Sequence, residues 1–175
     1  MTASAHDSIH QVGTTIRPLE RTDRSAILEL LSATGVFNDA ELAIALELVD
    51  VVLDKPHQED YIINVYDDGH GVAGYYCVGP TPATEGTYDL YWIAVDPQRH
   101  GKGIGTLLLR HAEAVVLSRK GRLMIVETSS RPSYELTRRF YKSSGYTILA
   151  EIKGYYRTDD DLVVFGKYVS QYSED

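Results

Sequence analysis

A glycine-rich turn between a buried strand and a helix is the part of this sequence best suited to chemistry. Leu90–Val95 is a short run of apolar, aromatic and β-branched residues, which predicts a buried strand. The polar and glycine-rich segment Gln98–Gly105 follows it, and an amphipathic helix comes next. At the N-terminus of a helix, unpaired backbone N–H groups converge and the helix dipole is positive, so such a turn can bind an anion. We therefore expect a phosphate-bearing ligand at this turn.

Two common phosphate-binding motifs do not fit the turn. A P-loop requires GxxxxGK[ST], which the segment does not contain. A dinucleotide fold requires three glycines directly after the strand and an acid after the next one, and Glu127 could be that acid. However, three polar residues precede the first glycine, Thr106 stands where the third glycine belongs, and no second βαβ half follows Glu127. These details oppose a dinucleotide site.

The spacing of the turn resembles a third kind of phosphate site. The Q-x-x-G-x-G pattern at residues 98–103, after a strand and before a helix, is similar to the acetyl-CoA signature of the GNAT superfamily of N-acetyltransferases. The F-Y-x-x-x-G-Y element at residues 140–146 supports the resemblance independently, because it matches the element that follows the superfamily's fifth strand. The resemblance extends over nearly the whole chain, from Ile16 to the last predicted strand.

The resemblance implies that acetyl-CoA is the acyl donor. The backbone amides of the turn would surround the pyrophosphate, and the small residues at positions 101, 103 and 105 would let the backbone approach it closely. The pantetheine amides would pair with the backbone of the preceding strand. One departure is Tyr134, where members of the superfamily commonly carry an asparagine that contacts the cofactor. The residues assigned to the cofactor are Ile93, Ala94, Val95, Arg99, His100, Gly101, Lys102, Gly103, Ile104, Gly105, Thr106, Tyr134 and Tyr141.

Acyl transfer to an amine also needs a base and an acid. The resemblance assigns to Tyr141 the protonation of the CoA thiolate. Two carboxylates are candidates for the base: Asp89 near the start of the central strand and Glu127 at the end of its neighbour. In the superfamily the acceptor pocket is built by the first two helices, the loop around the central strand and the last two strands, so the resemblance assigns to it Phe37, Tyr88, Tyr91, Tyr155 and Tyr156. The chain has thirteen tyrosines and three phenylalanines, and tyrosine would give this pocket apolar walls with hydrogen-bonding tips.

These residues predict an N-acetyltransferase that moves an acetyl group directly from acetyl-CoA to a primary amine in a ternary complex. The amine could belong to a small molecule or to the N-terminus of a peptide or protein. The alternative is a non-catalytic CoA-binding module, a sensor or a partner protein, which would keep the glycine turn but would need neither Tyr141 nor a base.

Composition limits the possible partners and the location. The net charge of −8 argues against nucleic acid, and no apolar run is long enough to cross a membrane. Residues 38–68 hold nine acids and one lysine, whereas residues 99–142 hold ten Lys/Arg and three acids, which suggests a cationic acceptor and an anionic donor. The single cysteine, Cys77, fits a reducing cytoplasm, and the scattered histidines predict no metal. A homodimer is possible.

The elements that position these residues predict an α/β fold. We expect one domain over residues 15–170, with a mixed, GNAT-like sheet of about six to seven strands flanked by about four helices, between a flexible N-terminus (1–14) and a C-terminal tail (171–175). Thr22-Asp23 could cap the first helix, and Asn38 with Glu41 resembles a capping box for the second. The last helix, between Pro132 and Gly145, should bury Leu136 and Phe140 and expose Arg138 and Arg139. The strands are expected at 16–19, 61–66, 72–78, 88–95, 122–127, 146–152 and 162–169, and the helix after the turn at 103–119.

Overall fold

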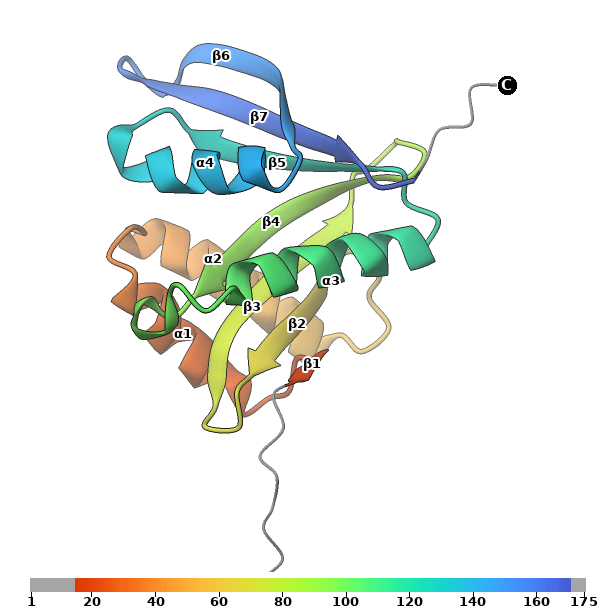
Figure 1. Cartoon of the computed structure of the whole chain (residues 1–175). Coiled ribbons are helices and arrows are strands. Elements are labelled where there is room, and N and C mark those ends of the chain that lie inside the picture. The colour runs from red at the N-terminus through yellow and green to blue at the C-terminus, as the bar shows by residue number, and fades with distance from the viewer. Residues whose placement is uncertain (1–14, 171–175) are drawn as a thin grey trace, which may run out of the picture.

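The computed structural model describes residues 15–170, in which seven strands form one mixed sheet of order β1–β2–β3–β4–β5–β7–β6 (Figure 1). Every neighbouring pair is antiparallel except β4 and β5, so the α/β prediction is confirmed. The predictions for residues 1–14 and 171–175 lie outside this range. The elements are β1 (Thr15–Pro18), α1 (Asp23–Ala33), α2 (Asp39–Asp54), β2 (Ile62–Asp67), β3 (Val72–Pro80), β4 (Thr87–Val95), the 3₁₀ turn η1 (Pro97–Arg99), α3 (Ile104–Ser118), β5 (Leu123–Ser129), the 3₁₀ turn η2 (Pro132–Tyr134), α4 (Glu135–Ser143), β6 (Thr147–Arg157) and β7 (Asp160–Tyr168).

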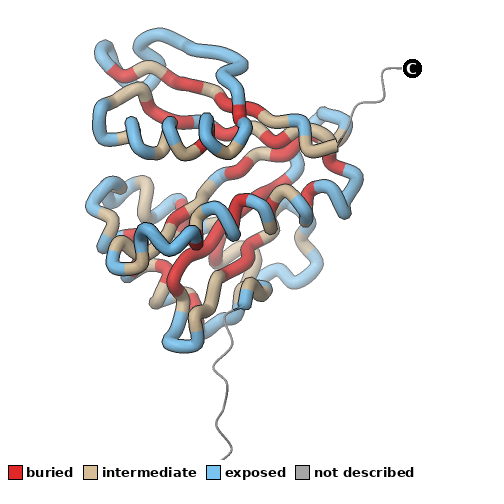
Figure 2. Tube along the Cα trace, viewed as in Figure 1, coloured by how far each residue is buried: buried red, intermediate tan, exposed pale blue. Residues whose placement is uncertain are grey.

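Helices cover both faces of the sheet and enclose two apolar clusters. On one face α1 and α2 pack against β2, β3 and β4 around Ile27, Val49 and Tyr75. On the other face α3 and α4 enclose a larger cluster that includes Leu108 and Phe165. Figure 2 shows the buried stretches concentrated along the central strands, whereas β6 at the edge is exposed throughout. The two faces are therefore packed separately, and the sheet divides them.

A β-bulge interrupts β4 in its middle. Cys77 of β3 pairs with Trp92, and the next residue of β3, Val78, pairs with Leu90. Tyr91 is therefore an extra residue without a partner on β3. One extra residue reverses the alternation of side chains. As a result Leu90 packs in the cluster under α3, whereas Trp92, two residues later, packs in the cluster under α1 and α2.

The parallel strands β4 and β5 separate just before the bulge. Their pairing covers only Thr87, Tyr88 and Asp89 of β4, opposite Leu123–Ile125 of β5. Beyond Asp89 the two strands diverge, and Figure 1 shows the β5–β7–β6 part of the sheet leaning away from β4. The sheet is thus held together at one end of this strand pair and open at the other.

Local signals in the sequence place most helix ends correctly, with one exception. The capping box at the start of α2 is confirmed: the Asn38 side chain accepts hydrogen bonds from the Ala40 and Glu41 N–H groups, and the Glu41 carboxylate accepts the Asn38 N–H. Thr22, however, makes no capping hydrogen bond. The Asp23 carboxylate instead accepts the Glu20 N–H and two hydrogen bonds from Arg17, which fastens α1 to β1.

The predicted inner face of the last helix is partly wrong. Leu136 is 78% exposed, while Phe140 and Tyr141 pack inward. The helix begins at Glu135, after the η2 turn, and this turn leaves Leu136 on the outside of the first helical turn. Arg138 does not point to solvent either, because it donates to the backbone oxygens of Ser129 and Arg131. It therefore anchors the loop between β5 and α4.

We expect Gly79→Ala to destabilise the fold. A Cβ at this position in β3 would lie 2.0 Å from the Asp60 backbone oxygen and 3.1 Å from the Tyr91 ring, and the backbone atom cannot move aside as a side chain would. Overpacking of this kind costs about 1–3 kcal/mol. Urea unfolding should show the loss. Gly105→Ala is the control for stability, since its nearest contact would be an ordinary 3.6 Å to Phe140; an equal loss in both variants would contradict the prediction.

Candidate active site

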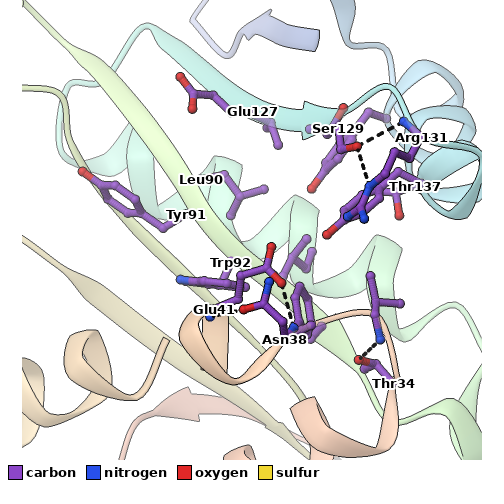
Figure 3. Close-up of a pocket in the computed structure, with 18 of the residues that line it drawn as sticks. Thr34, Asn38, Glu41, Leu90, Tyr91, Trp92, Glu127, Ser129, Arg131 and Thr137 are labelled. Atoms are coloured by element: carbon purple, nitrogen blue, oxygen red, sulfur yellow. Dashed lines mark hydrogen bonds between the residues drawn. The ribbon is translucent and has the colours of Figure 1, made fainter. Parts of the chain in front are cut away.

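A cavity of about 600 Å³ fills the space where β4 and β5 diverge. Its walls come from four parts of the chain: the α1–α2 connection, the second half of β4, the end of β5 with the first turn of α4, and the ends of β6 and β7. Figure 3 shows Leu90, Tyr91 and Trp92 on the β4 side, and Glu127, Ser129 and Arg131 one after another along the opposite wall. The predicted donor and acceptor regions thus meet in one cavity.

The glycine turn borders this cavity at the N-terminus of α3. Gly101 and Gly103 have φ of +77° and +76°, a left-handed conformation that favours glycine. The first backbone hydrogen bond into the helix runs from the Leu107 N–H to the Gly103 oxygen. The three preceding N–H groups, those of Ile104, Gly105 and Thr106, have no partner within the helix and are oriented along its axis. This geometry suits an anion.

The predicted anion cradle is narrower than the sequence suggested. The N–H groups of Arg99 and His100 bond to the oxygens of Asp96 and Pro97 within the η1 turn. The Arg99 guanidinium forms ion pairs with Asp68 and Asp96, and His100 Nε2 bonds to the Val95 oxygen at 3.0 Å. These groups stabilise the turn, so the N–H donors left for an anion are those of residues 101–106.

The separated part of β4 presents backbone groups to the cavity. The Asp96 N–H bonds to the Ala73 oxygen of β3. Because the N–H and C=O of successive residues in a strand point to opposite sides, Ala94 also faces β3, while Ile93 and Val95 face the opening toward β5. The Val95 oxygen is taken by His100. Ile93 therefore offers the free N–H and C=O on this edge for an extended ligand.

Tyr141 lies in the cavity wall and is held there by aromatic neighbours. Its ring contacts those of Phe140, Tyr146 and Phe165 at centroid distances of 5.3 to 5.9 Å, and the residue is 3% exposed. None of the hydrogen bonds found among the described residues uses its hydroxyl. Burial raises the pKa of Tyr141 well above its ordinary value of 10. The phenol therefore stays protonated at neutral pH and can donate.

Glu127 and Asp89, the two candidate bases, occupy different environments. Glu127 borders the cavity, and its pKa is raised first by partial burial and second by the negative charge of Asp89. Asp89 does not line the cavity; its carboxylate accepts a 2.7 Å hydrogen bond from Thr81 Oγ1 in the β3–β4 connection. Of the two carboxylates, Glu127 is the one that a ligand in the cavity can reach.

A buried carboxylate with two arginines forms the far end of the cavity. Asp160, whose side chain is 3% exposed, accepts a very short hydrogen bond from Ser129 Oγ and lies 3.1 Å from Arg131 Nε. Arg157 Nε is 4.0 Å from the same carboxylate oxygen. The Ser129 hydroxyl also accepts the Arg131 N–H (Figure 3). This group contains two positive charges and one negative charge.

A family model for the acetyltransferase (GNAT) domain matches residues 58–148, which is more than half of the chain. The chain belongs to the GNAT acetyltransferase family. Among solved structures, a protein from Desulfovibrio desulfuricans assigned to the same family is 38% identical and superposes with a TM-score of 0.87, covering 90% of this chain and all of that one. A comparison with curated proteins found no match.

Two more distant structures share the GNAT fold. The ribosomal-protein-S18-alanine N-acetyltransferase of Escherichia coli is 21% identical, with a TM-score of 0.73 over 93% of this chain and 98% of that one. An aminoglycoside 6′-N-acetyltransferase in complex with coenzyme A is 19% identical, with a TM-score of 0.72 over 91% and 99%. Their acceptors differ, a protein and an aminoglycoside, so the fold by itself does not identify the amine.

The aromatic residues of this GNAT domain divide between the cavity and the core. Of the residues predicted to bind the acceptor, Phe37, Tyr91 and Tyr156 line the cavity. Tyr88 does not: it is buried beside Gly121 in the cluster under α3. Tyr155 does not line it either, and its ring stacks edge-to-face on Tyr156 at 5.0 Å. We therefore remove these two tyrosines from the acceptor site.

An irregular end of β6 brings Tyr156 to the cavity. Ile152 pairs with Leu162 of β7, and Arg157 pairs with Asp160, so four residues of β6 lie opposite Asp161 alone. The Asp161 carboxylate accepts the N–H of Gly154 and the ammonium of Lys153, which closes this bulge. Gly154, whose φ is +62° in the structure, was the one signal of this bulge that the sequence offered.

Two further findings concern absences among the described residues. No helix within residues 15–170 is long and apolar enough to cross a membrane. No three histidine, cysteine or carboxylate side chains of the same range are grouped so that they could hold a metal ion.

Proposed function

We propose that this GNAT acetyltransferase moves an acetyl group from acetyl-CoA to a primary amine in the cavity between β4 and β5. The observation that carries the proposal is the divergence of these strands after Asp89, because it exposes the Ile93 backbone on the strand that leads into the turn with the N–H donors of residues 101–106. An extended ligand with amides along its length and a pyrophosphate at one end needs both sets of groups. The coenzyme A complex of the aminoglycoside 6′-N-acetyltransferase supports the same choice.

Glu127 and Tyr141 would supply the base and the acid. A lysine-type amine of pKa ~10.4 costs about 4–5 kcal/mol to deprotonate at pH 7, and an α-amine of pKa ~7.8 only about 1 kcal/mol. The ammonium group loses two protons during the reaction. Glu127 accepts one of them and passes it to solvent. Tyr141 gives its own proton to the CoA thiolate, and the second proton of the amine then replaces it on the Tyr141 oxygen. The new C–N bond forms as the C–S bond of the thioester breaks.

Transfer would be direct, in a ternary complex. The one thiol in the chain, Cys77, is fully buried in β3 under α1 and α2, and burial raises its pKa to about 12. A buried, protonated thiol is a poor nucleophile, so it is unsuited to carry the acetyl group. Incubation with labelled acetyl-CoA and no amine should leave the protein unlabelled. A labelled residue that transfers its acetyl group to an added amine would contradict direct transfer.

The release of free thiol from acetyl-CoA tests the function. The assay is run with a panel of candidate amine acceptors: polyamines, amino acids, peptides with free N-termini and lysine peptides. This panel covers both small-molecule and peptide acceptors. Turnover of at least one class supports the enzyme. Tight binding of acetyl-CoA without turnover of any class favours the alternative, a non-catalytic CoA-binding module. The dimer and the cytoplasmic location remain predictions.

Gly103→Ala should weaken acetyl-CoA binding. Nothing lies within 4 Å of a Cβ at this position, so the cost is in the backbone, where a left-handed φ costs an L-residue about 1–2 kcal/mol. A shift of the turn would misplace the N–H donors, and we expect Kd to rise about 10-fold, which corresponds to 1.4 kcal/mol. Calorimetry gives Kd. Gly71→Ala, in the β2–β3 hairpin with φ of +127° and equally open space, is the matched control outside the cavity and should leave Kd unchanged.

A further inference from the structure

We propose that the acceptor carries a carboxylate in addition to its amine, and that Arg131 and Arg157 bind this carboxylate at the far end of the cavity. The inference rests on the proposed function and specifies its acceptor. It differs from the cationic acceptor that the charge distribution along the sequence suggested.

The first observation is the local charge. Asp160 is the single carboxylate in contact with both arginines, so the group carries one excess positive charge within a cavity wall. A cation in such a wall attracts an anionic ligand more strongly than a cation in open water, because fewer solvent molecules screen it. Two other carboxylates line the cavity. Glu127 lies on this wall, two residues before Ser129 on the same face of β5 and about 6.6 Å along the strand. Glu41 lies at the start of α2, where its carboxylate accepts the Asn38 N–H.

The second observation is that the Arg131 side chain is held by Asp160 and Ser129 through its Nε atom. Its Nε contacts Asp160 at 3.1 Å and Ser129 Oγ at 3.4 Å, and its guanidinium carbon lies 5.6 Å from the centre of the Tyr134 ring. Its backbone is fixed as well, by the N–H bond to Ser129 and by Arg138. The ion pair with Asp160 runs through Nε, so the terminal nitrogens, which lie beside the Tyr134 side chain and interact with its hydroxyl, can also donate to a ligand. An arginine fixed in this way loses little entropy on binding, and its fork matches a carboxylate.

The third observation is that Arg157 adds a second, looser cation. Its side chain is 61% exposed, and 4.0 Å separates its Nε from Asp160, longer than a hydrogen bond. It directly follows Tyr156, which the β6 bulge brings into the cavity wall. Burial, and after it the charge of Glu127, raises the pKa of Tyr156 to about 12, so this hydroxyl is a neutral donor beside the two arginines. An amine at Glu127 and a carboxylate at the arginines would thus occupy the two ends of one wall.

The test compares acids with their amides. The substrates are ω-amino acids from glycine to 5-aminopentanoate, the common L-amino acids and a set of dipeptides, each offered as the free acid and as the primary amide. Thiol release from acetyl-CoA gives kcat/KM. We expect the acids to be preferred about 10- to 100-fold, the worth of hydrogen bonds to a charged group. Turnover with equal kcat/KM for acids and amides would overturn the inference and leave the proposed function intact.

Variants connect this preference to the arginines. Arg157→Gln should lower kcat/KM for the acids about 10-fold and leave the amides within 2-fold, a difference that a purely structural role would not produce. Arg131→Lys retains a cation beside Asp160 but loses the fork, so it should also reduce the preference. Arg139→Gln, on exposed α4 with Glu135 as its ion-pair partner, is the control and should preserve it. Unchanged preference in both site variants would overturn the inference.

A binding measurement separates this inference from the proposed function. Calorimetry on the CoA-bound protein compares 5-aminopentanoate with 5-aminopentanamide, in the wild type and in Arg157→Gln. If no amine is turned over but the acid binds more tightly and Arg157→Gln removes the difference, the carboxylate site stands and the acetyltransferase proposal fails. If the acid shows no advantage in either turnover or binding, the carboxylate site is wrong.

Discussion

Tyr141→Phe should lower kcat about 100-fold, near the lower end of the range for the loss of a general acid. The CoA thiolate has an unperturbed pKa of about 8.5, so it leaves slowly unless a proton reaches it. Tyr141 borders the cavity with a hydroxyl that none of the hydrogen bonds among residues 15–170 uses, and burial keeps that hydroxyl protonated by raising its pKa above 10. Phenylalanine keeps the ring contacts with Phe140, Tyr146 and Phe165 and removes only the donor.

Tyr146→Phe is the matched control for this variant. Tyr146 is equally buried and its ring touches that of Tyr141, but its hydroxyl points to the Met124 sulfur, 3.7 Å away, and the residue does not line the cavity. We expect its kcat to stay within 3-fold of the wild type, about 0.65 kcal/mol. A full kcat for Tyr141→Phe, under conditions where the absence of a pre-steady-state burst shows that product release does not limit the rate, would remove Tyr141 from the mechanism.

Stability should distinguish catalysis from packing in these variants. Because the Tyr141 hydroxyl has no partner among the described residues, its removal should change the free energy of unfolding by less than about 0.5 kcal/mol. Urea unfolding measures this. A loss of several kcal/mol together with the loss of activity would indicate that the hydroxyl supports the fold instead.

The features that depend on local spacing were readable in the sequence. The Asn38–Glu41 capping box and the glycine turn before α3 both follow from residues within eight consecutive positions. Such signals act through the local backbone, so tertiary contacts do not need to be known. The order of the elements, and with it the mixed sheet, follows from these boundaries.

The bulge at Tyr91 could not be predicted from the sequence, although it lies where β4 and β5 separate and the cavity begins. The bulge residue, Tyr91, lies within the continuous apolar and aromatic run Leu90–Val95, and no glycine, proline or other turn residue marks its position. In a strand buried on both faces, alternation gives no signal, so a change of register leaves no trace in the pattern. The sequence predicted the strand correctly and could not show where it leaves β5.

The contacts of Asp160 with Ser129, Arg131 and Arg157 could not be predicted from the sequence for a different reason. Ser129 is the last residue of β5 and Arg131 follows it, whereas Arg157 and Asp160 lie at the β6–β7 turn, almost thirty residues later. Only the antiparallel pairing of Ser129 with Leu162 brings them together. Counting charges along the chain placed the basic residues of segment 99–142 with the cofactor, whereas we propose that one of them, Arg131, binds the acceptor together with Arg157.

Glu127→Gln should lower kcat about 100-fold at pH 7 and should change the pH dependence. The base acts as a carboxylate, so activity falls as the pH drops through its pKa. Partial burial and the charge of Asp89 raise the pKa of Glu127 above 4.5, which moves the loss of activity to higher pH than for an ordinary glutamate. Glutamine has no proton to lose or gain here, so this part of the profile should disappear in the variant.

The ratio of wild-type to variant kcat, measured pH by pH, isolates this effect, because ionisation of the acceptor amine is common to both enzymes. The ratio should rise with pH through the Glu127 pKa and then level off. Asp89→Asn removes the negative charge beside Glu127, and the asparagine oxygen can still accept the Thr81 hydroxyl. In this variant the rise of kcat with pH should therefore have its midpoint at lower pH than in the wild type, and the plateau at higher pH should be retained. A flat ratio would show that Glu127 is not the base; a loss of the plateau in Asp89→Asn would restore Asp89 as the candidate.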